Sequence, residues 1–365
     1  MKKHSRMVPL LFLAVSAAVI GAIASGGDAS DPLASLSYLN GTYASVVDTQ
    51  VSAKLDASDA ALLAAASGKP QTSSSALSWT ETRLKNGDSL SGGTGLTVTV
   101  LAGSVKAVFS SGAVVDVSAG TTLSSGSALS PNHRYLVAED TAAAFTVVSK
   151  TAVVDYQGPY TFALSSAVDY NAMASALKTM HLFKGSYTGY GSGYDLELAP
   201  TRLQALIMFV RVLGEEDAAL SYTGSVPFSD IASGTNAARY VGYAYSKGYT
   251  NGYTATRWNP AGAVNVYQYT EFVLRALGYS SSANTDLSGT LTRAADSGVL
   301  TSGETAALKS GNFLRADLVY ISYYAMDATV SGSTDTLRDV LLSKGVFTAA
   351  EAAAAKSLVS GSRIS

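Results

Sequence analysis

Two arginines stand where a predicted helix begins, and their position suggests chemistry more strongly than that of other residues. Arg202 and Arg315 each come directly before an apolar run. The dipole of a helix favours acidic groups in its first turn, so an arginine at this place predicts an acidic partner nearby. For Arg202 that partner is either internal, with Asp195 and Glu197 as candidates, or a bound ligand.

Residues that could carry catalysis are few. The absence of cysteine removes thiolate nucleophiles and Cys-ligated metals. Of the histidines, His133 and His181 lie outside the N-terminal segment, and no H-E-x-x-H, G-x-S-x-G or P-loop motif occurs. Glu139 and Asp140 are adjacent in the chain, whereas a glycosidase needs two carboxylates on opposite sides of a sugar. We predict a non-catalytic protein without cofactor or metal, and keep a carbohydrate-processing enzyme as the alternative.

The charge balance argues against nucleic acid as the partner. The chain of 365 residues has 25 Lys and Arg against 27 Asp and Glu, for a net charge of −2. A phosphate-binding surface needs an excess of basic residues. Hydrophobic residues make up 47% of the chain, which favours folded domains over disorder. At roughly 150 residues per domain, the length predicts two or three units.

The N-terminal segment 1–24 has the layout of a signal peptide. Lys2, Lys3 and Arg6 precede an apolar run that ends in a small-x-small triplet at 22–24. This layout predicts export, with cleavage after the triplet. The alternative is that the apolar run is retained as a membrane anchor of an adhesin-like structural protein, because its length approaches that of a membrane-spanning helix.

Pattern changes along the chain predict several regions. Apolar residues recur at helical spacing over 31–66, and a Gly/Ser-rich linker follows at 67–76. Short β-branched runs separated by turn residues predict a small all-β domain over 77–164, either a sandwich or a barrel. Its predicted strands are 97–101, 105–109, 114–117, 135–138 and 145–148. Helical periodicity returns over 170–327 and continues in a C-terminal helical tail at 328–365.

The helical region contains three similar segments, at about 170–214, 228–279 and 287–327. Each has a helix, a turn, a loop that carries an aromatic residue in the first two segments, and a second helix. The three segments superpose when Arg202, Val266 and Arg315 are taken as equivalent points. The turns at 181–185, 248–252 and 298–302 then align as well.

At these residues the chain resembles the S-layer homology (SLH) family. TRLQ at 201–204 and LRAD at 314–317 stand where the family has its TRAE motif, WNP at 258–260 stands for its Phe-x-Pro, and FSD at 228–230 stands for its opening Phe-x-Asp. The resemblance covers about 160 of 365 residues. The chain departs from the family pattern at three positions, which puts some grooves in doubt: Val266 for Arg, Asn236 for Trp and Ala307 for the third aromatic residue.

The resemblance implies a fold and a function. Three SLH repeats form an all-α bundle with pseudo-threefold arrangement, and grooves between them bind a secondary polysaccharide attached to peptidoglycan. This predicts an exported cell-wall or S-layer-like surface protein. Arginine would present a planar fork of donors to a carboxylate of that anionic polymer. The predicted ligand-binding residues are Arg202, Arg315, Gly185, Gly252, Thr201, Gln204 and Trp258.

Some of these residues also have a packing interpretation. Trp258 is expected either to stack on a sugar or to pin its loop into the core. The tyrosine-rich stretch 240–253 is expected mainly to pack, with stacking on sugars as the alternative. Asp230 is expected to cap a helix or a turn.

Overall fold

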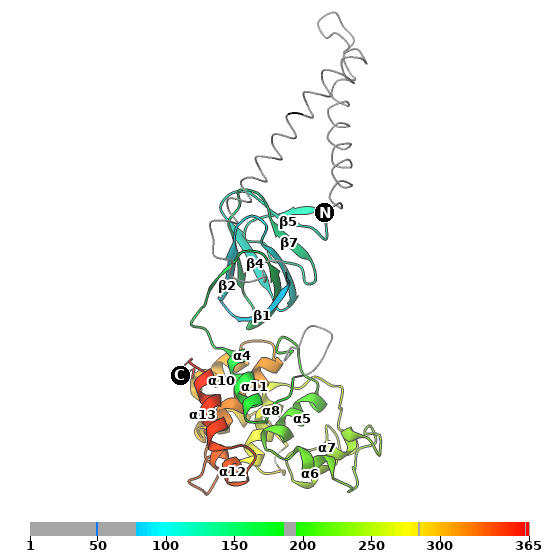
Figure 1. Ribbon diagram of the computed structural model, residues 1–365. Helices are drawn as coiled ribbons and strands as arrows, with labels where there is room; N and C mark the ends of the chain where they lie inside the picture. The colour runs from blue at the N-terminus through cyan, green and yellow to red at the C-terminus, as the bar shows by residue number, and fades with distance from the viewer. Residues whose placement is uncertain (1–48, 50–77, 186–194, 284, 362, 365) are drawn as a thin grey trace, which may run out of the picture. The chain divides into compact units, whose positions relative to one another are not determined.

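The structure is a computed structural model that describes residue 49 and the ranges 78–185, 195–283, 285–361 and 363–364 (Figure 1). The chain divides into one unit of residues 1–74 and a second of residues 75–365. Apart from Thr49, the predicted signal peptide 1–24, helical segment 31–66 and linker 67–76 lie outside the described residues.

Ten strands of the described residues form two antiparallel sheets (Figure 1). One sheet has the order β1-β9-β3-β7-β5-β6 and the other has the order β10-β2-β8-β4. The strands are β1 (Thr80–Lys85), β2 (Ser89–Gly92), β3 (Thr97–Ala102), β4 (Val105–Phe109), β5 (Val114–Asp116), β6 (Thr121–Leu123), β7 (Arg134–Val137), β8 (Ala143–Val147), β9 (Thr151–Gln157) and β10 (Thr161–Ala163).

The β region folds because alternate side chains of its strands enter one core. Val105 and Ala107 of β4 are buried, and the lysine between them is exposed, which is the period of a half-buried strand. Leu90 and Phe145 of one sheet share this core with Val98 of the other. Neither sheet closes on itself, so the arrangement favours the sandwich of the two predicted alternatives. All five predicted strands are present.

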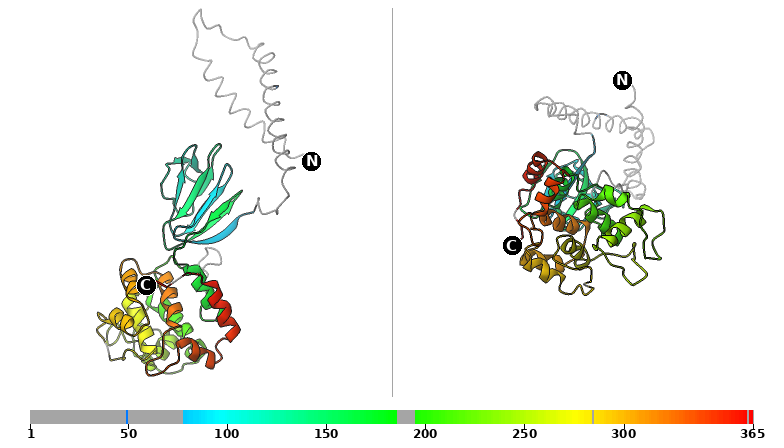
Figure 2. Two further views of the ribbon diagram at one scale, coloured as in Figure 1. Left: turned by 90° about the vertical axis from the view of Figure 1, so that its left-hand side faces the viewer. Right: turned by 90° about the horizontal axis from the view of Figure 1, so that it is seen from below.

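The second half of the chain is helical, as predicted (Figure 1). Its helices are α4 (Tyr170–Thr179), α5 (Arg202–Val212), α6 (Glu216–Leu220), α7 (Asn236–Ser246), α8 (Val266–Ala276), α9 (Thr290–Asp296), α10 (Ser302–Lys309), α11 (Arg315–Ala325), α12 (Leu337–Ser343) and α13 (Ala349–Leu358). Helix α13 packs beside α4 (Figure 2). No helix among the described residues has the length and apolar content to cross a membrane.

Helices α5, α8 and α11 begin at the three residues that were superposed in the sequence. Each helix has 11 residues, and each contacts the other two. The residue two positions after each of these helix starts caps its own helix. The side chains of Gln204, Gln268 and Asp317 each accept a hydrogen bond from the backbone N–H three residues earlier in the chain. The motif therefore has a local role in starting a helix, separate from any ligand.

The loops that precede these helices pair with one another. The N–H of Arg202 donates to the carbonyl of Gly262 at 2.8 Å, so the loop before α8 lies against the start of α5. The N–H of Arg315 donates to the carbonyl of Leu198 at 2.9 Å, so the loop before α5 lies against the start of α11. These bonds fix the positions of both arginines relative to a neighbouring loop.

Candidate functional site

Arg202 is a buried cation, and it has no ion pair within the described residues. The residue is 7% exposed. One guanidinium nitrogen, Nη2, donates to the backbone carbonyl of Asn251 at 2.8 Å, and Nε has no hydrogen-bond partner among the described residues. A buried charge normally has a paired counter-charge, so Arg202 is an exception that needs an explanation.

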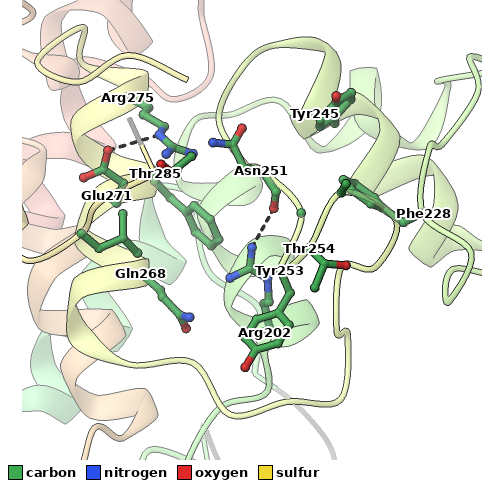
Figure 3. A pocket seen from close by; sticks show the side chains of 14 residues that line it. Arg202, Phe228, Tyr245, Asn251, Tyr253, Thr254, Gln268, Glu271, Arg275 and Thr285 are labelled. Atoms are coloured by element: carbon green, nitrogen blue, oxygen red, sulfur yellow. Dashed lines mark hydrogen bonds and ion pairs between the residues drawn. The ribbon is translucent and has the colours of Figure 1, made fainter. Parts of the chain in front are cut away.

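The guanidinium lies in a pocket of about 510 Å³ (Figure 3). We call it the Arg202 pocket. Helix α5 supplies the arginine, α8 supplies one wall, and the loop after α7 supplies another. Its lining residues are Arg202, Phe228, Tyr245, Asn251, Gly252, Tyr253, Thr254, Ala255, Gln268, Glu271, Phe272, Arg275, Thr285 and Leu287. The volume falls within the range that small-molecule ligands occupy.

The pocket has a positive charge balance. Arg202 and Arg275 face a single lining carboxylate, Glu271, which gives 2 − 1 = +1. Arg275 Nε lies 3.2 Å and Arg293 Nη2 lies 2.9 Å from oxygens of Glu271, so this carboxylate is already compensated twice (Figure 3 shows the first pair). Its charge therefore offers little to Arg202, and an added anion would meet a net positive field.

The surroundings of Arg202 disfavour its charge without removing it. Burial, and secondly the like charge of Arg275, lower the pKa of Arg202 from 12.5 to about 10. At pH 7 the group is still a cation. Its Cζ lies 4.8 Å from the ring centre of Trp258 and 5.7 Å from that of Phe272, and these rings compensate part of the lost hydration. A carboxylate that enters the pocket would compensate the rest.

Two tyrosines at this pocket are exposed, whereas others in the same stretch are packed. Tyr245 and Tyr253 line the pocket with exposed fractions of 44% and 65%. Tyr240 and Tyr243 are buried, and their hydroxyls donate to Glu216 and Glu215 respectively. The stretch 240–253 thus divides into packing residues and residues available to a ligand.

Arg315 has the internal carboxylate partner that Arg202 lacks. Its Nη1 lies 3.3 Å from Oδ2 of Asp195, and both side chains are nearly buried, at 11% and 6% exposed. Burial lowers the pKa of Arg315, and the charge of Asp195 opposes that effect. Asp195, which the sequence offered as a partner for Arg202, therefore pairs with the other arginine. This differs from the expectation that Arg315 presents its guanidinium to a ligand.

The remaining predicted ligand residues occupy different places. Trp258 is fully buried and donates through Nε1 to Thr250, so it packs beneath Arg202 and has no surface for a sugar. Thr201 and Gln204 form the capping box of α5 and do not line the pocket. The placements of Thr201 and Gln204 differ from the predicted ligand contacts, and the burial of Trp258 agrees with the expectation that it pins its loop rather than with stacking on a sugar. Asp230 accepts the N–H groups of Trp258 and Asn259, as expected of a turn cap.

The two predicted glycines also differ from each other. Gly252 lines the pocket, and a Cβ there would lie 2.1 Å from the carbonyl oxygen of Thr254, so no other residue fits without a backbone shift. Gly185 is exposed and lies outside the pocket. Gly185 is also not the residue with a left-handed backbone in the turn 181–185. That residue is His181, with φ of 63°, and Gly248 and Gly298 have the same conformation in the turns 248–252 and 298–302.

Sequence reasoning missed several pocket residues. Arg275 and Glu271 lie on α8 and were not among the candidate residues. Asn251 was recognised only as part of the turn at 248–252, and Tyr253 only as part of the tyrosine-rich stretch 240–253. The available signal was the spacing of Glu271 and Arg275, since charges four residues apart on a helix face one another.

The candidate catalytic residues do not assemble into a site. Glu139 and Asp140 are both exposed in the turn between β7 and β8, where Asp140 has a φ of 56°. His133 pairs with Asp116 at 2.7 Å, and His181 pairs with Glu351 at 3.0 Å. Across the described ranges, no group of three or more His, Cys, Asp or Glu residues is arranged to hold a metal ion.

Comparison with known proteins gives no further guide. No protein-family model matches the chain, and no curated protein matches it.

Proposed function

We propose that this is a non-catalytic cell-surface protein whose helical region attaches to the cell wall by binding an anionic secondary wall polysaccharide. The observation that carries the proposal is Arg202, a buried guanidinium with an unpartnered Nε in a pocket of positive charge. A carboxylate on a sugar in this pocket would accept from the guanidinium and neutralise its buried charge. The exposed faces of Tyr245 and Tyr253 suit the sugar rings beside it.

The proposal includes a pseudo-threefold arrangement of three SLH-like repeats. Supporting it, α5, α8 and α11 have equal lengths, begin at equivalent residues and contact one another. The backbone bonds of Arg202 and Arg315 each lead to the loop of a different segment, as a cyclic arrangement requires. The Arg202 pocket would lie between the first and second repeats.

One groove, rather than three, is expected to bind acidic sugar. Arg315 is paired with Asp195, and Val266 gives the second helix no guanidinium. A second pocket, of about 530 Å³, lies beside Val266, and its single charged lining residue is Lys309. The Arg202 pocket therefore carries the proposed affinity. The predicted signal peptide supplies the route of export, and the β region is then displayed at the surface.

A sedimentation experiment tests the proposal. The full chain should sediment with purified cell wall and stay in solution with wall stripped of its secondary polymer. Arg202→Gln should weaken wall binding at least about tenfold, because a charge-assisted hydrogen bond contributes about 1.5–3 kcal/mol. Arg239→Gln, on the exposed side of α7, is the matched control and should bind like the wild type. Equal sedimentation with intact and stripped wall would refute the proposal.

A further inference from the structure

Another buried charge in the helical region is the carboxylate of Glu304, which is paired with Arg363. Glu304 of α10 is 0% exposed. Its carboxylate accepts from Nε of Arg363 at 2.6 Å, from Nη2 of Arg363 at 2.8 Å and from the hydroxyl of Tyr320 at 2.7 Å. The bidentate contact is the strong geometry that arginine forms with a carboxylate.

The guanidinium of Arg363 and the backbone of Ile364 make further contacts. Nη2 of Arg363 also donates to the carbonyl of Val299 at 2.7 Å, and its Cζ lies 4.9 Å from the ring centre of Tyr324. The carbonyl of Ile364 accepts from Thr301 at 2.5 Å, and its N–H donates to the hydroxyl of Tyr320 at 3.3 Å. Arg363 and Ile364 are thus bound by both side-chain and backbone contacts, as a peptide ligand is.

The positions that hold these two residues correspond to the lining of the Arg202 pocket. In the repeat alignment, Thr301 and Glu304 are equivalent to Asn251 and Thr254, and Tyr320 and Tyr324 are equivalent to Glu271 and Arg275. All four counterparts line the Arg202 pocket. Where Arg275 projects from α8, its counterpart on α11 is Tyr324, and a guanidinium arrives from Arg363 instead.

We propose that the third repeat contains a guanidinium-binding groove, plugged by the chain's own Arg363 and Ile364, which takes an arginine-bearing peptide once the plug leaves. The repeat equivalence rests on the proposed function; the contacts do not. The fixed charge in this groove is the carboxylate of Glu304, so an acidic sugar would be repelled. Gly361, one residue beyond Ser360, supplies a flexible connection to α13.

A peptide-binding experiment tests this groove without any cell wall. A chain that stops after Ser360 should bind the peptide SGSRIS, the sequence of residues 360–365, as measured by fluorescence anisotropy of the labelled peptide. The same peptide with Arg363→Ala should bind at least about tenfold more weakly, because the charge-assisted bonds to Glu304 are lost. The full chain should bind the labelled peptide far more weakly than the truncated chain, because its own segment is present at high effective concentration.

Two controls keep the result decisive. Glu304→Gln in the truncated chain should abolish the preference for the arginine peptide, whereas wall sedimentation of the truncated chain should equal that of the full chain. That second readout separates failure of the groove from failure of the wall-binding proposal. A truncated chain with native circular dichroism that ignores the peptide, or binds its alanine form equally well, would overturn the groove.

A full-length variant covers the case in which truncation prevents folding. Arg363→Ala keeps the backbone contacts of Ile364 and removes only the guanidinium. It should bind N-acetyl-arginine amide, whereas the wild type should not bind this probe, and the amides of residues 299–304 should exchange faster than in the wild type. Wild-type exchange together with no binding of this probe would count against the groove.

Discussion

Arg202 and Arg315 begin helices of equal length, yet their burial is compensated differently. Arg315 pairs with Asp195, a residue 120 positions away, and so connects the start of α11 to the loop before α5. Arg202 has a carbonyl, two aromatic rings and an unpartnered Nε. Removing one partner of a buried ion pair is strongly destabilising, whereas an unpaired buried arginine lowers stability unless a ligand completes it. The difference assigns a structural role to Arg315 and, in our proposal, a binding role to Arg202.

The largest expected effect is on stability when Arg315 loses its charge. Arg315→Met should lower the free energy of unfolding by about 3 kcal/mol, because it leaves Asp195 buried without its partner. Urea denaturation measures this change. In a double-mutant cycle, adding Asp195→Asn should recover part of the loss, since no buried charge then remains uncompensated. Purely additive effects would remove the structural role of this pair.

The opposite end of α5 provides a second paired site that sharpens the contrast with Arg202. Glu216 accepts from Lys184 at 2.5 Å, from Tyr240 at 2.6 Å and from Arg211 at 2.7 Å. Burial alone would raise its pKa, but these donors lower the pKa to about 2. Because the folded pKa lies below the unfolded value of 4.5, the carboxylate stabilises the fold above about pH 4.5, and this contribution is lost as pH falls toward 2.

Glu216→Gln tests this pH dependence. The full shift from 4.5 to about 2 corresponds to at most about 3 kcal/mol, and screening by water reduces it to about 2 kcal/mol. The variant should therefore be about 2 kcal/mol less stable than the wild type at pH 7, and the two should converge near pH 2. Thermal or urea unfolding across this range gives the comparison. A difference that stays constant with pH would show that Glu216 acts through packing.

Sequence patterns predicted the helices and strands better than they predicted which charged side chains pair with one another. The five predicted strands and the helices that begin at Arg202, Val266 and Arg315 follow from local periodicity and capping, which neighbouring residues determine. Local patterns thus predicted that both arginines lie where a helix begins.

Charge pairing depends on contacts that cross the fold, and there sequence reasoning failed. Asp195 was one of two candidate partners for Arg202 because it is close in the chain, but the fold brings it to Arg315. For Trp258 the sequence left two roles open, stacking on a sugar or pinning its loop into the core, and only its burial shows that it packs beneath the guanidinium of Arg202. Arg275 was not a candidate at all, since the pocket brings α8 to α5 and to the loop at 251–255. Such residues become visible only when segments distant in sequence meet.

A smaller effect separates the shape of the Arg202 group from its charge. Arg202→Lys keeps a cation in the pocket but offers no planar fork, and its ammonium cannot reproduce the contact to Asn251 together with a bidentate ligand contact. Wall affinity should fall by less than in Arg202→Gln and by at most about tenfold, equivalent to about 1.4 kcal/mol. Sedimentation at several protein concentrations measures the affinity. Wild-type binding by the lysine variant would mean that charge alone recruits the polymer.

The smallest expected effect, and the one that most directly tests the unpaired arginine, is the stability of Arg202→Met. Lowering the pKa of Arg202 from 12.5 to about 10 means that the folded state disfavours the charge by up to about 3 kcal/mol at pH 7. Methionine removes this penalty, and it also removes the bond to Asn251 and the contact with Trp258, which contribute about 1 kcal/mol each. We expect the variant to be about 1 kcal/mol more stable than the wild type in urea denaturation at pH 7. Because the folded pKa lies below the unfolded value, wild-type stability rises as pH passes 10, so the advantage of methionine should shrink there. A variant that is instead as destabilised as Arg315→Met would mean that Arg202 has a structural partner after all.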